Sequence, residues 1–178
     1  MALTDAKLNR IHRFGAVQRV MGILLMIFSL TMLPPMAVSW LYADGTAPAF
    51  ALALSINVVL GALTWWPVRH SRAELKIRDG FLVTVLFWMV LGLSGAIPLY
   101  VADQPGLTIP QAVFESVSGL TTTGATVIVG LDGLPKALLY YRQQLQWFGG
   151  MGLVILAIAI LPMLGVGGMQ LYLSLIHI

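Results

Sequence analysis

The chain has 178 residues, of which 58% are apolar and 10% are charged, and its mean hydropathy is +0.89. A soluble domain carries about 25% charged residues to keep its surface hydrated, so this composition excludes a soluble globular domain and predicts a membrane protein. The net charge is +3 and the basic residues stand beside apolar stretches, which favours basic loops at a membrane surface over nucleic-acid binding. The absence of cysteine excludes a disulfide scaffold, a thiolate zinc site and a cysteine nucleophile.

Four stretches are long enough to cross a hydrocarbon core of about 30 Å, which takes around 20 helical residues. Their residue ranges are 17–42, 48–66, 81–101 and 141–166. No small-residue cleavage site interrupts the first stretch, so we expect it to be kept as a transmembrane helix and not removed as a signal peptide. Pro34, Pro35 and Pro98 are expected to kink or end their helices.

Lysine and arginine are unevenly divided between the two sides of the predicted bundle. Eight of the ten precede or open the first span or fill the loop between the second and third: Lys7, Arg10, Arg13, Arg19, Arg69, Arg72, Lys76 and Arg78. The opposite side holds two, Lys136 and Arg142. Cytoplasmic loops carry the excess of basic residues, so the N-terminus and the loop 67–80 are predicted to be cytoplasmic. Its basic part, residues 69–78, is expected to meet anionic lipid or, alternatively, to dock a regulatory partner.

The segment between the third and fourth spans is too long for a simple connection and too apolar for an exposed one. Within it, residues 109–120 predict a helix of about 12 residues, or about 18 Å, which is near half the hydrocarbon thickness. Thr108 can act as the N-cap with Gln111 as its N3 partner, and Pro110 falls in the first turn, where its missing N–H costs little. β-Branched residues and a glycine then end the helix. A short helix followed by extended chain at this place predicts a re-entrant loop.

Residues 121–126 carry the chemistry of this loop. Non-helical backbone at membrane depth is tolerated only where it packs in protein or lines a watery cavity, so these carbonyl groups need a partner. A dehydrated cation fits, because carbonyl dipoles can replace its hydration shell and the helix C-terminus directs about −0.5 charge toward the same place. Gly124 supplies backbone angles that a Cβ would resist. The pattern predicts an ion-conducting pore loop; the alternative is a loop packed for structural reasons in another kind of transporter.

Several motifs resemble those of a known family. They are FESVSGLTTTGAT at 114–126, QWFGGMG at 146–152, ILP at 160–162 and GGMQLY at 167–172. Together they are similar to the first pore loop and the following helix of TrkH-type potassium uptake proteins, members of the Trk/Ktr/HKT superfamily. The likeness is spread over most of residues 81–172, and the two preceding helices fit the extra N-terminal pair of TrkH-type members.

The resemblance, with the spans above, implies an all-α membrane protein with about four transmembrane helices, one short re-entrant pore helix and an extended filter loop. The helix pair with its basic loop takes residues 1–80, and the first of four helix–pore loop–helix repeats takes residues 81–172. The carbonyls that line the selectivity filter and bind K⁺ are implied to be those of Thr122, Thr123, Gly124 and Ala125. In this superfamily a glycine at the position of Gly124 goes with potassium preference, and a serine there admits sodium.

The resemblance also implies potassium uptake, as a symporter or channel, across the bacterial inner (plasma) membrane. Its partners are implied to be a second copy, in a homodimer, and a cytoplasmic nucleotide-binding regulatory subunit of the TrkA type. Residues 173–178 stand where the family continues into a charged cytoplasmic segment, so we expect a truncated reading frame. The alternatives are a non-conducting truncated fragment or a helical membrane subunit without transport activity of its own. A membrane enzyme is disfavoured, because Glu115 is the only ionisable residue at the depth of the loop.

Polar and small residues around the loop carry further expectations. Glu115 is predicted to anchor the short helix by hydrogen bonds in preference to contacting the ion. Arg142 is predicted to extend toward the headgroups in preference to pairing with Glu115 or Asp132. Asn57, in the second span, is expected to hydrogen-bond to a neighbouring helix. Close helix approach behind the filter is expected at Gly149, Gly150 and Gly152.

Overall fold

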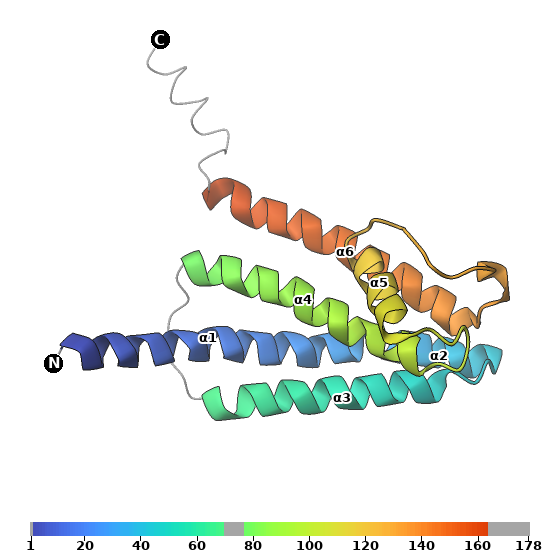
Figure 1. Cartoon of the computed structure of the whole chain (residues 1–178), viewed down its shortest axis with the longest axis horizontal. Coiled ribbons are helices and arrows are strands. Elements are labelled where there is room, and N and C mark those ends of the chain that lie inside the picture. Colours follow the sequence, from blue (N-terminus) through green and yellow to red (C-terminus); the bar gives the residue numbers. More distant parts are fainter. Residues whose placement is uncertain (1, 70–76, 164–178) are drawn as a thin grey trace, which may run out of the picture.

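The computed structural model describes residues 2–69 and 77–163, and within them every regular element is helical, which confirms the predicted all-α class. The elements are α1 (Ala2–Leu30), α2 (Leu33–Tyr42), α3 (Ala47–Trp65), α4 (Ile77–Val101), α5 (Ile109–Leu120) and α6 (Lys136–Met163), with 3-10 turns at Trp66–Val68 and Leu131–Gly133. In Figure 1 the long helices run along one axis and α5 is the short helix between α4 and α6, both of which it contacts. Helix α1 packs against α3 and α4.

Within the described residues, three helical stretches are long and apolar enough to cross a membrane: Gly15–Tyr42, Ala47–Val68 and Asp79–Val101. They correspond to the first three predicted spans. The fourth predicted span coincides with α6 as far as Met163, and its last residues lie outside the described part of the chain. Large apolar side chains are exposed along all of these helices, as expected for surfaces that face lipid.

The first span is divided by a break between α1 and α2. Pro34 and Pro35 stand at the start of α2, where proline lacks the N–H that would continue the bonding of α1, so the predicted interruption is confirmed. The backbone carbonyl of Thr31 at the break accepts a hydrogen bond of 2.8 Å from the Gln144 amide of α6. Of the two expectations for Pro98, a kink or a helix end, the second is wrong, because Pro98 lies inside α4 and the helix continues to Val101.

Close backbone contact joins α1 to α3. A Cβ built on Gly22 would lie 2.8 Å from the carbonyl oxygen of Gly61, and one on Gly61 would lie 2.9 Å from the carbonyl oxygen of Gly22. Asn57 of α3 is fully buried, and within the described residues neither atom of its side-chain amide has a hydrogen-bond partner. The predicted interhelical bond of Asn57 is therefore wrong.

Helix α6 is fixed to the helix pair at its first turn. Asp44, in the turn between α2 and α3, accepts a bond of 2.9 Å from the backbone N–H of Ala137 on one oxygen. Its other oxygen accepts from the hydroxyls of Ser39 at 2.6 Å and Thr46 at 2.8 Å. Burial raises the pKa of Asp44, but the hydrogen bonds from Ser39, Ala137 and Thr46 lower it more, so the pKa lies below its ordinary value. Asp44 stays ionised and links the pair to α6.

Further along α6, Tyr141 is fully buried at the centre of the bundle. Its hydroxyl donates to the carbonyl of Gly95 in α4 at 2.9 Å, and its ring makes a T-shaped contact with that of Phe50 in α3 at a centroid distance of 5.3 Å. These contacts set the rotation of α6 about its own axis. That rotation decides which side chains of α6 face the loop after α5.

Candidate functional site

Helix α5 begins and ends at the predicted residues, Ile109 and Leu120. Its start is fixed by Gln111, whose side-chain oxygen accepts from the backbone N–H of Thr108 at 2.9 Å and from the Thr108 hydroxyl at 2.8 Å. Pro110 occupies the first turn. All of these determinants are local in the sequence, which is why the pattern of residues predicted the helix correctly.

The end of α5 is a Schellman motif. The N–H of Thr123 donates to the carbonyl of Ser118 and the N–H of Thr122 donates to that of Gly119, both at 3.0 Å. Thr122 takes the left-handed conformation that the motif requires, with φ of 56°, although glycine is the usual residue there. A β-branched residue with positive φ costs about 1–3 kcal/mol, so the surrounding contacts must hold it. The chain then continues without regular structure through residues 123–130, with Gly124 at φ of 74°.

Glu115 connects α5, the loop and α6. Its side chain is buried, and one oxygen accepts from the Thr126 hydroxyl and from the backbone N–H of Val127, both at 2.6 Å. The other oxygen accepts from Arg142 Nε and lies 3.0 Å from Nη2 of the same guanidinium. Glu115 thus anchors the loop, as predicted.

The prediction for Arg142 is wrong, because its side chain is nine-tenths buried against Glu115 and does not extend to the headgroups. The rotation of α6 brings the guanidinium within reach of a carboxylate that is itself buried. An unpaired buried charge costs far more than a pair with saturated hydrogen bonds, so pairing wins over solvation at the interface.

A second anchor comes from Ser118, whose hydroxyl donates to the carbonyl of Ala125 at 2.7 Å. Glu115 and Ser118 are three residues apart and share one face of α5, so this face holds the loop at residues 125–127. Sequence reasoning missed the role of Ser118, although the spacing of the two polar residues on a short apolar helix was the available signal.

Residues 122–124 lie between the end of α5 and these anchors. These three residues are exposed, and in the described part of the chain no hydrogen bond reaches the carbonyl of Thr122, Thr123 or Gly124. A hollow of about 570 Å³ opens beside this stretch along α5. It is lined mainly by apolar side chains of the helix and by Thr121, Thr123 and Ala125. The loop therefore has three consecutive carbonyl groups without hydrogen bonds from the described residues, in an exposed stretch beside this hollow.

The back of the loop is packed against the glycine-rich part of α6. A Cβ on Gly149 would overlap the backbone of Leu120. At Gly150 it would lie 3.8 Å from Cγ2 of Thr122, and at Gly152 it would lie 3.6 Å from the Trp88 ring, both ordinary contacts. The predicted close approach of helices is therefore required at Gly149 alone among the three glycines.

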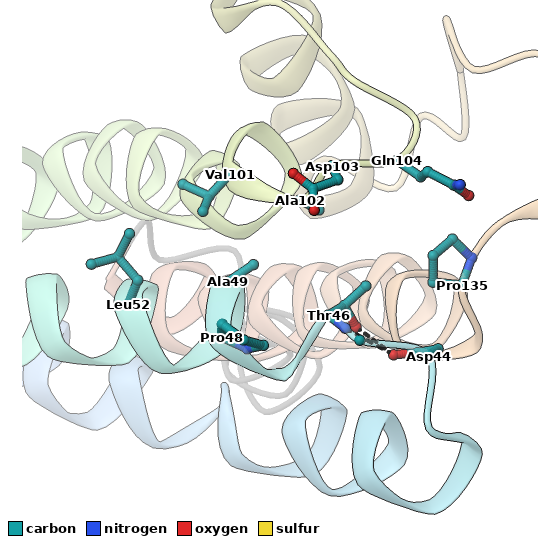
Figure 2. A pocket seen from close by; sticks show the side chains of 11 residues that line it. Asp44, Thr46, Pro48, Ala49, Leu52, Val101, Ala102, Asp103, Gln104 and Pro135 are labelled. Atoms are coloured by element: carbon teal, nitrogen blue, oxygen red, sulfur yellow. Dashed lines mark hydrogen bonds between the residues drawn. The ribbon is translucent and has the colours of Figure 1, made fainter.

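A second hollow, of about 490 Å³, lies where the helix pair meets α4 and the start of α6. Figure 2 shows Asp44 and Thr46 on one side of it and Asp103 and Gln104, just after α4, on the other. Both oxygens of Asp44 already accept hydrogen bonds from within the chain. This region is a structural contact between the helix pair and the rest of the bundle.

Spans of apolar helix, a half-length helix and an extended loop beside it define a multi-pass α-helical membrane protein. A family model described as TrkH, cation transport protein, matches residues 46–177. The chain belongs to the TrkH family, which confirms the predicted resemblance. The family is one of cation transporters and not of enzymes.

Individual relatives agree with the family. The chain is 62% identical over 156 residues to the Trk system potassium uptake protein TrkH of Halomonas elongata, a match that covers 88% of the chain and 32% of that protein. It is 56% identical over 159 residues to TrkH of Escherichia coli strain K12, covering 89% and 33%. The crystal structure of the potassium transporter TrkH from Vibrio parahaemolyticus matches with a TM-score of 0.82 and 55% identity, covering 88% and 33%. The chain spans about a third of the length of these relatives.

Proposed function

We propose that this chain takes part in potassium uptake across the membrane by supplying the first of four pore repeats. The ion would be bound by the backbone carbonyls of Thr122, Thr123, Gly124 and Ala125. The relatives are named as potassium uptake proteins, which supports the choice of ion. The observation that carries the proposal is the stretch 122–124, whose carbonyls are free of hydrogen bonds in the described residues while the chain on both sides is tied to α5.

The chemistry of the loop suits an ion that must bind and leave again. Carbonyl dipoles replace the hydration shell of K⁺ without adding a full negative charge that would trap it. The Glu115 carboxylate beside the loop is neutralised by Arg142 and saturated with hydrogen bonds. Its role is therefore to hold the loop and not to ligate the ion. The C-terminus of α5 adds a partial negative charge directed at the loop.

The wider organisation forms part of the same proposal. The helix pair takes residues 1–80 and the first repeat residues 81–172; the tail 173–178 lies outside the described residues. Eight basic residues on one side against two on the other support a cytoplasmic N-terminus in a bacterial inner membrane. A homodimer and a TrkA-type nucleotide-binding regulatory subunit are the proposed partners, supported by the words "Trk system" in the names of the relatives. Transport is proposed to be by symport or through a channel.

The test uses a chimaera in which this chain replaces the matching third of the Halomonas elongata TrkH. In a bacterial strain without other potassium uptake systems, we expect the chimaera to restore uptake of K⁺. Gly124→Ser should lower the ratio of K⁺ to Na⁺ uptake by about tenfold, equivalent to about 1.4 kcal/mol of discrimination. Expressed alone, the chain presents one filter strand and should restore no uptake.

Gly130→Ser is the matched control. Gly130 has the same left-handed backbone, with φ of 75°, and open space around it, but it lies outside the proposed ligands. Its substitution therefore carries the same conformational strain and should leave the uptake ratio unchanged. An unchanged ratio in Gly124→Ser, or an equal fall in both variants, would contradict the filter assignment.

A further inference from the structure

Ser118 contacts the loop through two of its groups. Its backbone carbonyl accepts from the N–H of Thr123 at 3.0 Å, and its side-chain hydroxyl donates to the carbonyl of Ala125 at 2.7 Å. The side chain is buried, with 6% of the residue exposed. Ser118 is thus hydrogen-bonded to both ends of the tripeptide 123–125, which has Gly124 at its centre.

We infer that Ser118 is a positioning residue that sets the ion selectivity of this loop by fixing the Ala125 carbonyl; the inference rests on the proposed function. Of the four proposed ligand carbonyls, only that of Ala125 accepts a hydrogen bond within the described residues. Its oxygen keeps a second lone pair for an ion, but its position is tied to α5. The carbonyls of Thr123 and Gly124 lie between the two contacts of Ser118, and the carbonyl of Thr122 shares its peptide unit with the bonded N–H of Thr123.

The hydrogen bond from Ser118 to the Ala125 carbonyl disfavours binding of an ion smaller than K⁺ in two ways. A smaller ion needs its oxygen ligands closer together, and an oxygen bonded to a buried hydroxyl on a packed helix resists that movement. The hydrogen bond also draws on the electron density of the oxygen and weakens its field, on which a smaller ion depends more. Both effects favour K⁺ over Na⁺. Loss of the hydroxyl removes both together.

The loop keeps its other contacts with α5 when this hydroxyl is removed. Residues 126 and 127, which follow Ala125, are held by the Glu115 carboxylate, and the backbone bonds of the Schellman motif hold Thr122 and Thr123. Ser118→Ala leaves all of these bonds in place and adds no atoms. We therefore expect the variant to fold and to change the selectivity.

The experiment compares K⁺ and Na⁺ uptake by Ser118→Ala and Ser118→Thr in the chimaera. Ser118→Ala should lower the K⁺/Na⁺ uptake ratio by about fivefold, the factor that one typical hydrogen bond makes in an equilibrium. Uptake of K⁺ itself should persist. Ser118→Thr keeps a hydroxyl and should keep the ratio near that of the parent. The ratio does not depend on how much protein reaches the membrane.

Ser116→Ala is the control for loss of a buried hydroxyl. Ser116 is on the same helix and fully buried, and its hydroxyl has no hydrogen-bond partner in the described part of the chain. The substitution should leave the ratio unchanged, and an equal fall there would overturn the role of Ser118. A fall in Gly124→Ser without one in Ser118→Ala would overturn the inference alone. No fall in either variant would overturn the proposed function together with the inference.

Discussion

The helix pair α1–α3 and the loop region between α5 and α6 are held together by different interactions. Between α1 and α3 the pair relies on close backbone contact at Gly22 and Gly61 and on one bond of 2.9 Å from the Gln18 amide to the carbonyl of Thr64. It leaves the amide of Asn57 buried without a partner in the described residues. Around the loop, Glu115 is bonded through both oxygens to Thr126, Val127 and Arg142. A helix satisfies its own backbone hydrogen bonds, so packing can join two helices with few polar bonds between them. An extended loop beside apolar helices does not bond its own backbone groups in this way, so it needs hydrogen-bond donors and acceptors from side chains.

The largest effect is expected where the loop is anchored. Glu115→Gln removes the charge that balances Arg142 and leaves a guanidinium nine-tenths buried. Breaking one side of a buried ion pair costs about 3–5 kcal/mol, so the thermal unfolding temperature of the purified chimaera in detergent should fall strongly. Combining Glu115→Gln with Arg142→Gln should recover part of the lost stability, since neither charge of the pair then remains buried. If the double variant were as unstable as the two single losses added together, the pair would not be coupled.

A smaller loss is expected from packing behind the loop. Gly149→Ala places a methyl group on the backbone of Leu120, which no change of rotamer can relieve. We expect a destabilisation of about 1–3 kcal/mol, as for overpacking in a dense core. Gly150→Ala is the control, because its methyl group would meet only the Thr122 side chain at 3.8 Å. Thermal unfolding of both variants measures the difference, and similar unfolding temperatures would show that α6 shifts away from α5 without cost.

Features fixed by neighbouring residues could be predicted from the sequence, and those fixed by helix rotation could not. The bounds of α5 follow from Thr108 and Gln111 at its start and from the loss of helix-forming residues after its end. Positive φ was expected at Gly124 and is present there, but the helix ends through the same conformation at Thr122, where no local signal marks it. Arg142 lies 27 residues from Glu115, and their pairing depends on how α6 is turned by its buried contacts.

Substitution of Asn57 is expected to have the smallest effect on stability, and the effect should be stabilising where the others are destabilising. A buried amide without partners costs about 1–3 kcal/mol relative to a paired one, and an apolar side chain of similar size does not carry that cost. Asn57→Leu should therefore leave the stability of the chimaera unchanged or raise it by about 1 kcal/mol, whereas Glu115→Leu should lower it severely. Thermal unfolding of the two variants side by side measures this contrast directly. A marked loss in Asn57→Leu would mean that the amide of Asn57 has a partner in the assembled protein, and the helix pair would then depend on a buried polar bond as the loop does.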